Sequence, residues 1–149
     1  MVCDLMSYLL NSSIKTIEVM IGSLSYGSAL SAGAYITFNF AYDDIGITGG
    51  GTDTLTISDG HYVASAVLGA SAANAASDEV GFIFELDGSV IGSAGGRQAI
   101  GKVGADAAEC VFTIESGNTA DLKLKISSVT GTVNAVTFRS QIFIRRVDL

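Results

Sequence analysis

The chain of 149 residues contains no proline, only two cysteines and only one histidine. Cys3 and Cys110 lie far apart and form no CxxC pair, so the ligand spacing of a zinc site is missing. The single histidine, His61, offers no His-rich cluster in its place. We therefore expect no metal ion and no cofactor, and two unpaired thiols suit assembly in a reducing cytoplasm.

Charged residues are also scarce, at 15% of the sequence, against about 25% in a typical domain. Eight Lys and Arg against fifteen Asp and Glu give a formal net charge of −7. That balance argues against a nucleic-acid-binding surface, which needs clustered basic residues. The one basic cluster, Arg139, Arg145 and Arg146, is expected to meet acidic groups on a neighbour. Covering by partner proteins would explain the shortage of surface charge.

Long hydrophobic runs are missing too, although 48% of the residues are hydrophobic. No run approaches the roughly 18 residues that cross a bilayer, and the first fifteen residues lack the basic start of a secretion signal. We expect neither membrane insertion nor conventional secretion. The apolar residues lie instead in short alternating segments, which favours a self-associating β-protein.

The segment 55–68 is the most informative of these alternating segments, because neither of its faces is fully polar. A strand of this kind must bury one face in its own core and the other against a neighbour. Further alternating segments are predicted as strands at 35–42, 80–86, 110–114, 122–126 and 136–147. In segment 55–68 the first face comprises Tyr62, Ala64, Ala66 and Leu68, and the second comprises His61, Val63, Ser65 and Val67.

Turn residues separate the predicted strands. Asp87-Gly88 is typical of a tight β-hairpin, because both positions tolerate φ > 0. Ser116-Gly117-Asn118 is predicted to turn the chain between two strands. Loops are expected at 43–53, which contains three consecutive glycines, and at 69–77, 92–108 and 127–134, with a second short strand inside 92–108.

Six or more short strands without a long helix indicate an all-β sandwich or barrel of antiparallel strands. We divide the chain into an N-terminal arm, residues 1–31, and a β-domain, residues 32–149. The arm would dock on a neighbour or on the domain; alternatively, it supplies an ordinary first strand of the same sheet. Proline and dense lysine, which protect exposed sheet edges, are scarce here, so edges covered by neighbouring subunits are expected.

Three features suggest chemistry but have simpler explanations. Residues 96–103 nearly spell the phosphate loop GxxxxGK[ST], but Val103 stands where the hydroxyl should be and no helix follows. His61 lacks a GxSxG nucleophile elbow, so a surface or interface histidine is the better interpretation. The acids Asp43, Asp44, Asp53 and Asp59 match no EF-hand and are interpreted as solvated loop residues instead of calcium ligands.

The order of four motifs resembles a known family. Gly60-x-Tyr62 opens an alternating strand, and Phe82-x-Phe84-x-Leu86-Asp87-Gly88 occupies the place of an apolar strand followed by Asn-Gly. Residues 111–126, centred on Ser116-Gly117-Asn118, and the closing strand 137–144 complete the order. Over residues 54–149 the chain resembles the complement 1q and tumour-necrosis-factor-like jelly-roll family. The resemblance implies an all-β, antiparallel two-sheet jelly-roll sandwich that assembles as a homotrimer, with apolar and aromatic residues packed about the threefold axis.

The sequence departs from the secreted animal members of that family. It has no collagen-like stalk, carries Asn118 where they have Asp, and lacks their glycine after the aromatic of the closing strand. It is similar instead to the stalkless versions in bacteriophage virions. We therefore expect a non-enzymatic structural virion protein, assembled in the host cytoplasm: a trimeric capsid decoration or cement protein, or a head-fibre module. The alternative is a tail-fibre or fibre-tip module that binds a receptor or carbohydrate through the loops at 43–53, 69–77 and 92–108.

The expected partners are two further copies of the chain and a capsid or other virion protein. The residues predicted to form the trimer or partner interface are mostly aromatic: Tyr35, Phe38, Phe40, His61, Tyr62, Phe138, Phe143 and Arg145.

Overall fold

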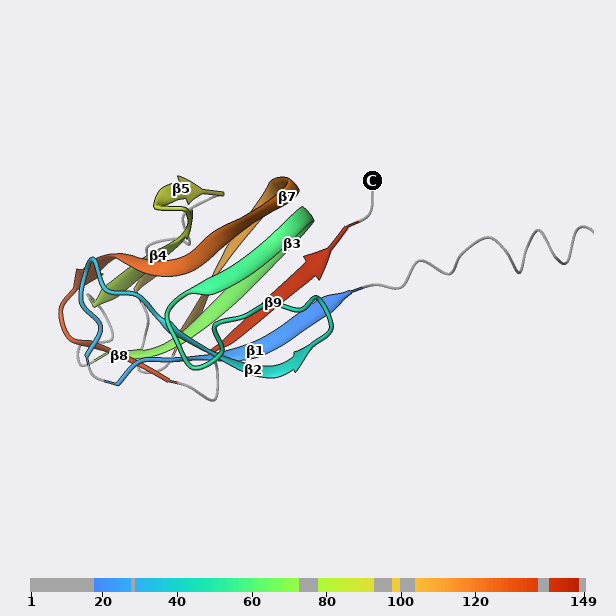
Figure 1. Cartoon of the computed structure of the whole chain (residues 1–149). Coiled ribbons are helices and arrows are strands. Elements are labelled where there is room, and N and C mark those ends of the chain that lie inside the picture. Colours follow the sequence, from blue (N-terminus) through green and yellow to red (C-terminus); the bar gives the residue numbers. More distant parts are fainter. Residues whose placement is uncertain are drawn as a thin grey trace, which may run out of the picture.

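The structure is a computed structural model in which residues 18–27, 29–72, 78–92, 98–99, 104–136 and 140–147 are described. Every regular element in this part of the chain is a β-strand (Figure 1). The strands are β1 (Val19–Ser25), β2 (Thr37–Asp43), β3 (Leu55–Ala72), β4 (Glu79–Leu86), β5 (Ser89–Ile91), β6 (Gln98–Ala99), β7 (Gly104–Thr130), β8 (Val133–Ala135) and β9 (Gln141–Arg146).

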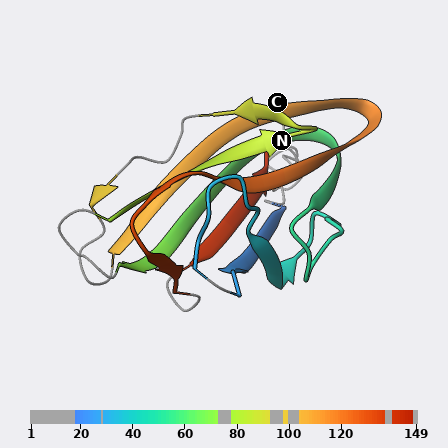
Figure 2. The same ribbon diagram turned by 90° about the vertical axis from the view of Figure 1, so that its left-hand side faces the viewer.

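All strand pairs are antiparallel, and the hydrogen-bonded order is β2-β1-β9-β3-β7-β4-β5, with β6 beside β4 and β8 beside β3. The strands β3 and β7 form one long ribbon that changes register once, between the pairs Gly60↔Ile114 and Ser58↔Thr119. At that point the ribbon folds over, and Figure 2 shows β7, in orange, doubling back on itself. The fold-over converts a continuous sheet into the two layers of a sandwich.

The first layer contains β2, β1, β9, the later part of β3 and the earlier part of β7. The second layer contains β4, β5, β6, the start of β3 and the later part of β7. Side chains at alternate positions of both layers fill the space between them, as the period of two in a strand requires. The largest fully buried side chains are Tyr62, Phe38, Phe82, Phe84, Met20, Leu24, Ile36, Leu55, Ile57, Leu68, Leu122 and Leu124.

Glycine is required at the fold-over. Gly60 has φ +147°, and an added β-carbon would lie 2.9 Å from Arg146 Nε and 3.0 Å from the Tyr62 hydroxyl oxygen. Both neighbours belong to a network at this end of the sandwich. The Tyr62 hydroxyl donates to the carbonyl oxygens of Ser58 (3.1 Å) and Asp59 (3.2 Å), and Arg146 donates to the Asp59 carbonyl (3.1 Å) and forms an ion pair with Glu18 (3.2 Å).

Several sequence-based expectations are confirmed. Tyr62, Ala64, Ala66 and Leu68 are buried, while the alternate residues of β3 face outward. The Asp87-Gly88 turn joins β4 to β5 with φ values of 49° and 78°, the positive pair that a tight hairpin needs. A short strand, β6, does lie within 92–108.

Other expectations need correction. Residues 116–118 do turn the chain, at the fold-over, but they do not separate two strands: β7 continues through them and both its halves pair with β3. The loops expected at 69–77 and 127–134 are shorter, because β3 runs to Ala72 and β7 to Thr130. The final strand is also shorter than 136–147, since β9 begins at Gln141.

The segment interpreted as an arm contributes to the sheet. Within residues 1–31, Val19–Ser25 forms β1, which lies between β2 and β9. This arrangement corresponds to the alternative of a first strand, and it places the start of β1 beside the end of β9 (Figure 1). The helical turns considered for residues 4–11 lie outside the described residues.

Candidate interaction surface

The outer side of the first layer carries an unusual number of apolar side chains. We call this surface the outer face; it consists of the side chains on β2, β1, β9, β3 and β7 that point away from the core. Two rows of paired residues cross it, and they include aliphatic or aromatic side chains on adjacent strands. One row is Tyr42, Ile21, Phe143, Ser65 and Glu109, and the next is Val19, Arg145, Val63 and Val111.

Most of the exposed apolar side chains of the described residues lie on this face. Val111 is 75% exposed, Tyr42 54%, Ile21 44%, and Val67 and Phe143 38% each. The remaining large one, Val90, lies apart on β5 and is 58% exposed. Contiguous exposed apolar surface on a soluble domain marks an interaction site more often than scattered residues do.

The outer face is hollowed near its centre. A cavity of about 160 Å³ lies where β1, β9 and β3 meet. Its size suits the end of a single side chain from another molecule. Its lining is Ile21, Ser65, Val67, Gln141, Ile142 and Phe143.

Three titratable side chains lie on the same face. His61 Nδ1 is 2.8 Å from Thr113 Oγ1 on the adjacent strand, at the end of the face near the fold-over. Arg145 on β9 and Glu109 on β7 are exposed, and neither forms an ion pair with another described residue. These two charges therefore stand beside apolar residues without an ion-pair partner in the part of the chain that the structure describes.

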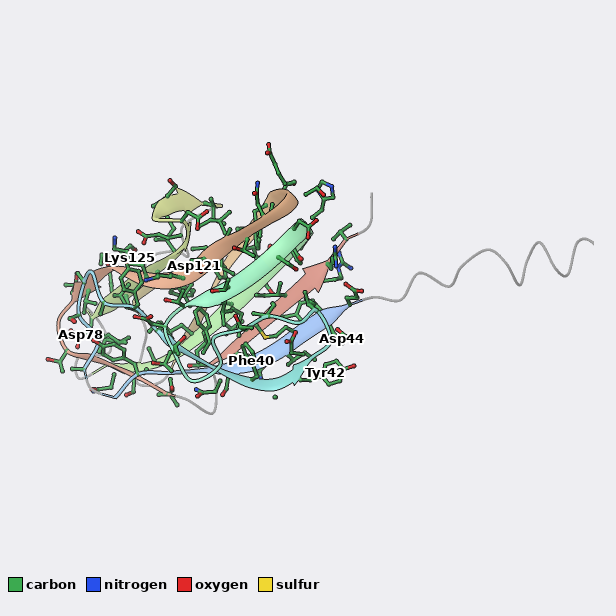
Figure 3. All side chains as sticks on the ribbon, in the orientation of Figure 1. Phe40, Tyr42, Asp44, Asp78, Asp121 and Lys125 are labelled. Atoms are coloured by element: carbon green, nitrogen blue, oxygen red, sulfur yellow. The ribbon has the colours of Figure 1, made fainter. Side chains whose placement is uncertain are left out.

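The outer side of the second layer is built differently. Glu85 on β4 is only 4% exposed, because the Tyr35 hydroxyl donates to it (2.9 Å) and Lys125 forms an ion pair with it (2.8 Å). The hydrogen bond from Lys125 holds the pKa of Glu85 below its usual range, against the opposing effect of burial. The ammonium groups of Lys123 and Lys125 also lie 4.8 and 5.7 Å from the centre of the Tyr35 ring. Figure 3 labels Lys125, together with Asp121 on the same strand.

The loop acids are dispersed and serve as local hydrogen-bond acceptors. Asp44 accepts hydrogen bonds from the Val19 amide and from the Tyr42 hydroxyl (3.2 Å). Figure 3 labels Tyr42 and Asp44. Asp43 accepts from the Ile45 amide, and Asp59 accepts from the Gly117 amide across the fold-over. Among the described residues, no three His, Cys, Asp or Glu side chains come close enough to share a metal ion.

A polar cleft of about 550 Å³ lies at the fold-over, between the Asp87-Gly88 turn and the bend of β7. Hydroxyl, amide and carboxylate groups line much of it, and it has no aromatic side chain. The lining residues are Leu86, Asp87, Thr113, Ile114, Glu115, Gly117, Asn118, Thr119 and Ala120.

The structure brings together three of the predicted interface residues, His61, Phe143 and Arg145, on the outer face. Phe38 and Tyr62 have no exposed surface, so they contribute to the core instead of to a surface. Tyr35 lies on the opposite layer, where it is bonded to Glu85. Two predicted residues remain, Phe40 and Phe138. Phe40 is half-buried under the glycine loop, with an added β-carbon at Gly50 only 3.1 Å from its ring; Phe138 lies outside the described residues.

The sequence-based prediction missed Ile21, Tyr42, Val67 and Val111 as interface candidates. Alternation in segment 55–68 places Val67 on the second face. An apolar residue on the solvent side of a strand is the sequence feature that could have indicated an interface there. Cys110 is buried, and burial raises the pKa of its thiol to about 12. It lies in the core, where Phe112 beside it stacks on Tyr62 with ring centres 5.3 Å apart.

No helix among the described residues is long and apolar enough to cross a membrane. No family model and no curated protein matches the sequence. Among solved structures, the globular domain of zebrafish complement 1qA superimposes with a TM-score of 0.62 and 10% identity, over 89% of this chain and 98% of that domain. Murine APRIL, of the tumour-necrosis-factor family, superimposes with a TM-score of 0.58 and 11% identity, over 87% of this chain and 99% of its own. At such low identity the similarity concerns the fold, and the chain therefore has the all-β, antiparallel jelly-roll fold of these two proteins.

Proposed function

We propose that the chain is a non-enzymatic structural protein that assembles into a homotrimer through its outer face. The observation that carries this proposal is the set of five exposed apolar side chains concentrated on that face. Covering them would remove apolar surface from water, the main favourable contribution to protein association. The jelly-roll fold, which the chain shares with non-enzymatic proteins, and its low content of charged residues support the same proposal.

A homotrimer fits the face better than a partner from another class. A nucleic acid would require a basic surface, whereas the chain has a net charge of −7. Sedimentation velocity, combined with light scattering behind size exclusion, tests the assembly. We expect a particle of three times the subunit mass, 15.3 kDa, at micromolar concentration. A stable monomer at that concentration would contradict the proposal.

We further propose that the trimer belongs to a bacteriophage virion, where it decorates or cements the capsid or forms a module of a head fibre. The support for this step comes from the sequence, whose motifs and small-residue composition are similar to those of stalkless virion jelly rolls. In such a role the first layer would hold the trimer together, and the second layer and the loops would face the shell or the solvent. The protein would then be assembled in the host cytoplasm.

The test of the virion role is localisation in purified particles. Mass spectrometry of density-purified virions is expected to detect the chain, and electron microscopy of the same particles to show threefold densities at the capsid or head fibre. Detection of the protein only in the soluble fraction of the lysate would contradict the role.

The polar cleft at the fold-over favours a second candidate function, a receptor- or carbohydrate-binding module at a fibre tip. Its hydroxyl, amide and carboxylate groups can bond to sugar hydroxyls, although an aromatic platform is missing. A glycan array probed with the wild-type protein and with Asn118→Ala tests this candidate. Binding that the substitution weakens would support it, and equal binding by both proteins would place any glycan site elsewhere.

A further inference from the structure

We infer that neighbouring subunits of the assembly are joined by an ion pair between Arg145 of one copy and Glu109 of the next. This inference rests on the proposed homotrimer and specifies which parts of the outer face meet. It starts from two charged side chains of opposite sign that stand beside the exposed apolar side chains of this surface.

The two side chains form no ion pair with each other within one subunit. Arg145 is on β9 and Glu109 on β7, and β3 lies between these strands. Two strand spacings separate the residues by about 9–10 Å across the sheet, and they also belong to different rows. Ser65 is the β3 partner of Glu109, whereas Val63 is the β3 partner of Arg145.

Both charges are placed where an interface would remove them from water. Val111 follows Glu109 on the same side of β7, and Phe143 precedes Arg145 on the same side of β9. If a partner covers these apolar residues, it also covers the charges beside them. A charge that is buried without a partner is costly, so the covering surface must supply the opposite sign.

A second copy of the chain supplies that sign when the contact is heterologous. In a closed ring of three, one patch of each subunit meets a different patch of the next. The β7 part of the face, with Val111 and Glu109, would meet the β9 part of the next copy, with Phe143 and Arg145. Each of the three interfaces then contains one Arg145–Glu109 pair, and every such charge has a partner.

Charge reversal tests the pair. We expect Arg145→Glu, which places two carboxylates opposite each other, to raise the trimer dissociation constant by about tenfold or more. Glu109→Arg should do the same by opposing two guanidinium groups. The double variant, Glu109→Arg with Arg145→Glu, keeps the net charge of −7 and restores an opposite-sign pair at every interface. Its dissociation constant should return to within about threefold of the wild-type value.

Glu115→Arg provides the matched control. Glu115 is an exposed acid on the same strand, but it lies at the fold-over beside the polar cleft and away from the rows of the outer face. Its reversal should leave the dissociation constant near that of the wild type. Sedimentation equilibrium measures all five proteins, and circular dichroism establishes that each is folded.

The outcomes separate this inference from the homotrimer itself. If the single reversal variants assemble as the wild type does, the ion pair is overturned but the proposed homotrimer is not. Single reversals that weaken assembly without rescue by the double variant would also overturn it, since the two side chains would then act through contacts other than each other. A wild-type monomer would contradict the proposed function and, with it, the pair.

Discussion

The two outer surfaces of this sandwich are made from the same kind of strand but are completed in different ways. On the second layer, Glu85 is bonded to Lys125 and Tyr35 from two other segments of the same chain. On the first layer, the outer face presents Val111 and Phe143 to solvent and leaves Arg145 without an ion-pair partner among the described residues. One surface satisfies its own polar groups within the subunit, and the other leaves its charges exposed, where the proposed trimer would pair them.

The difference shows that the two outer sides of one sandwich can be suited to different roles. The segment before β2 runs antiparallel beside the later part of β7, where Ile36 donates to the Leu124 carbonyl (3.0 Å) and Gly33 to the Ile126 carbonyl (2.8 Å). It brings the Tyr35 hydroxyl to Glu85 on the outer side of the second layer. On the outer face, Arg145 and Glu109 form no ion pair with another described residue. Assembly through the outer face would leave the second layer intact.

The strongest test of this contrast replaces one exposed valine on each side. Val111→Lys on the outer face should raise the trimer dissociation constant by about a hundredfold or more, because an ammonium group would be buried in an apolar interface. Val90→Lys is the matched control, since Val90 is a similarly exposed valine on β5 and pairs with Glu85. Sedimentation equilibrium should find the control trimeric and the Val111 variant monomeric at micromolar concentration.

Both lysine variants should retain the wild-type circular dichroism spectrum, since each side chain already faces solvent in the subunit. Equal dissociation of the two variants would show that the outer face is not the assembly surface. The difference between the two layers would then have no bearing on assembly.

The second test breaks the network of the second layer. Glu85→Ala removes the acceptor shared by Tyr35 and Lys125, and we expect it to lower the free energy of unfolding by about 1–2 kcal/mol. Urea unfolding should be measured in the Val111→Lys background, where stability does not depend on subunit concentration. The trimer dissociation constant of Glu85→Ala in the otherwise wild-type chain should change little.

Tyr35→Phe is a milder variant for the same network. It removes only the 2.9 Å hydrogen bond and keeps the ring beside Lys123 and Lys125, so its effect should be smaller than that of Glu85→Ala. A Glu85→Ala protein as stable as its parent would mean that the network contributes nothing measurable to folding.

The sequence predicts well which side of a strand each residue faces, because this alternation depends on residues that are close together in the chain. Alternation in segment 55–68 assigns Tyr62 to one side and Val63 to the other, and the structure agrees. The Asp87-Gly88 hairpin is equally local, since two positive φ values suffice to specify it. Long-range pairing is different: a turn signal at 116–118 is compatible with a hairpin and also with a ribbon that bends while β7 stays paired with β3.

The candidate surface could be predicted only in part, for a related reason. Large aromatic residues suit a core as well as an interface, and Phe38 and Tyr62 lie in the core. Alternation with Cys110 and Phe112 places Val111 on the outward side, but a single outward valine does not indicate an interface. Only the pairing of β3 with both β7 and β9 shows that Val111 shares a row with Arg145.

The smallest expected effect is a pH dependence that belongs to the second layer alone. The hydrogen bond from Lys125 lowers the pKa of Glu85 in the folded chain below the ordinary value that it has in the unfolded chain. Its contribution to stability is therefore complete above the unfolded pKa and is lost as the pH falls through the folded pKa. In the Val111→Lys background, Glu85→Gln should make the loss of stability below about pH 5 shallower, by less than about 1 kcal/mol. Urea unfolding at stepped pH measures the slope, with Glu115→Gln as the control for an exposed acid. Equal slopes for Glu85→Gln and its parent would mean that Glu85 titrates alike in both states, and the second layer would then hold its carboxylate no more tightly than water does.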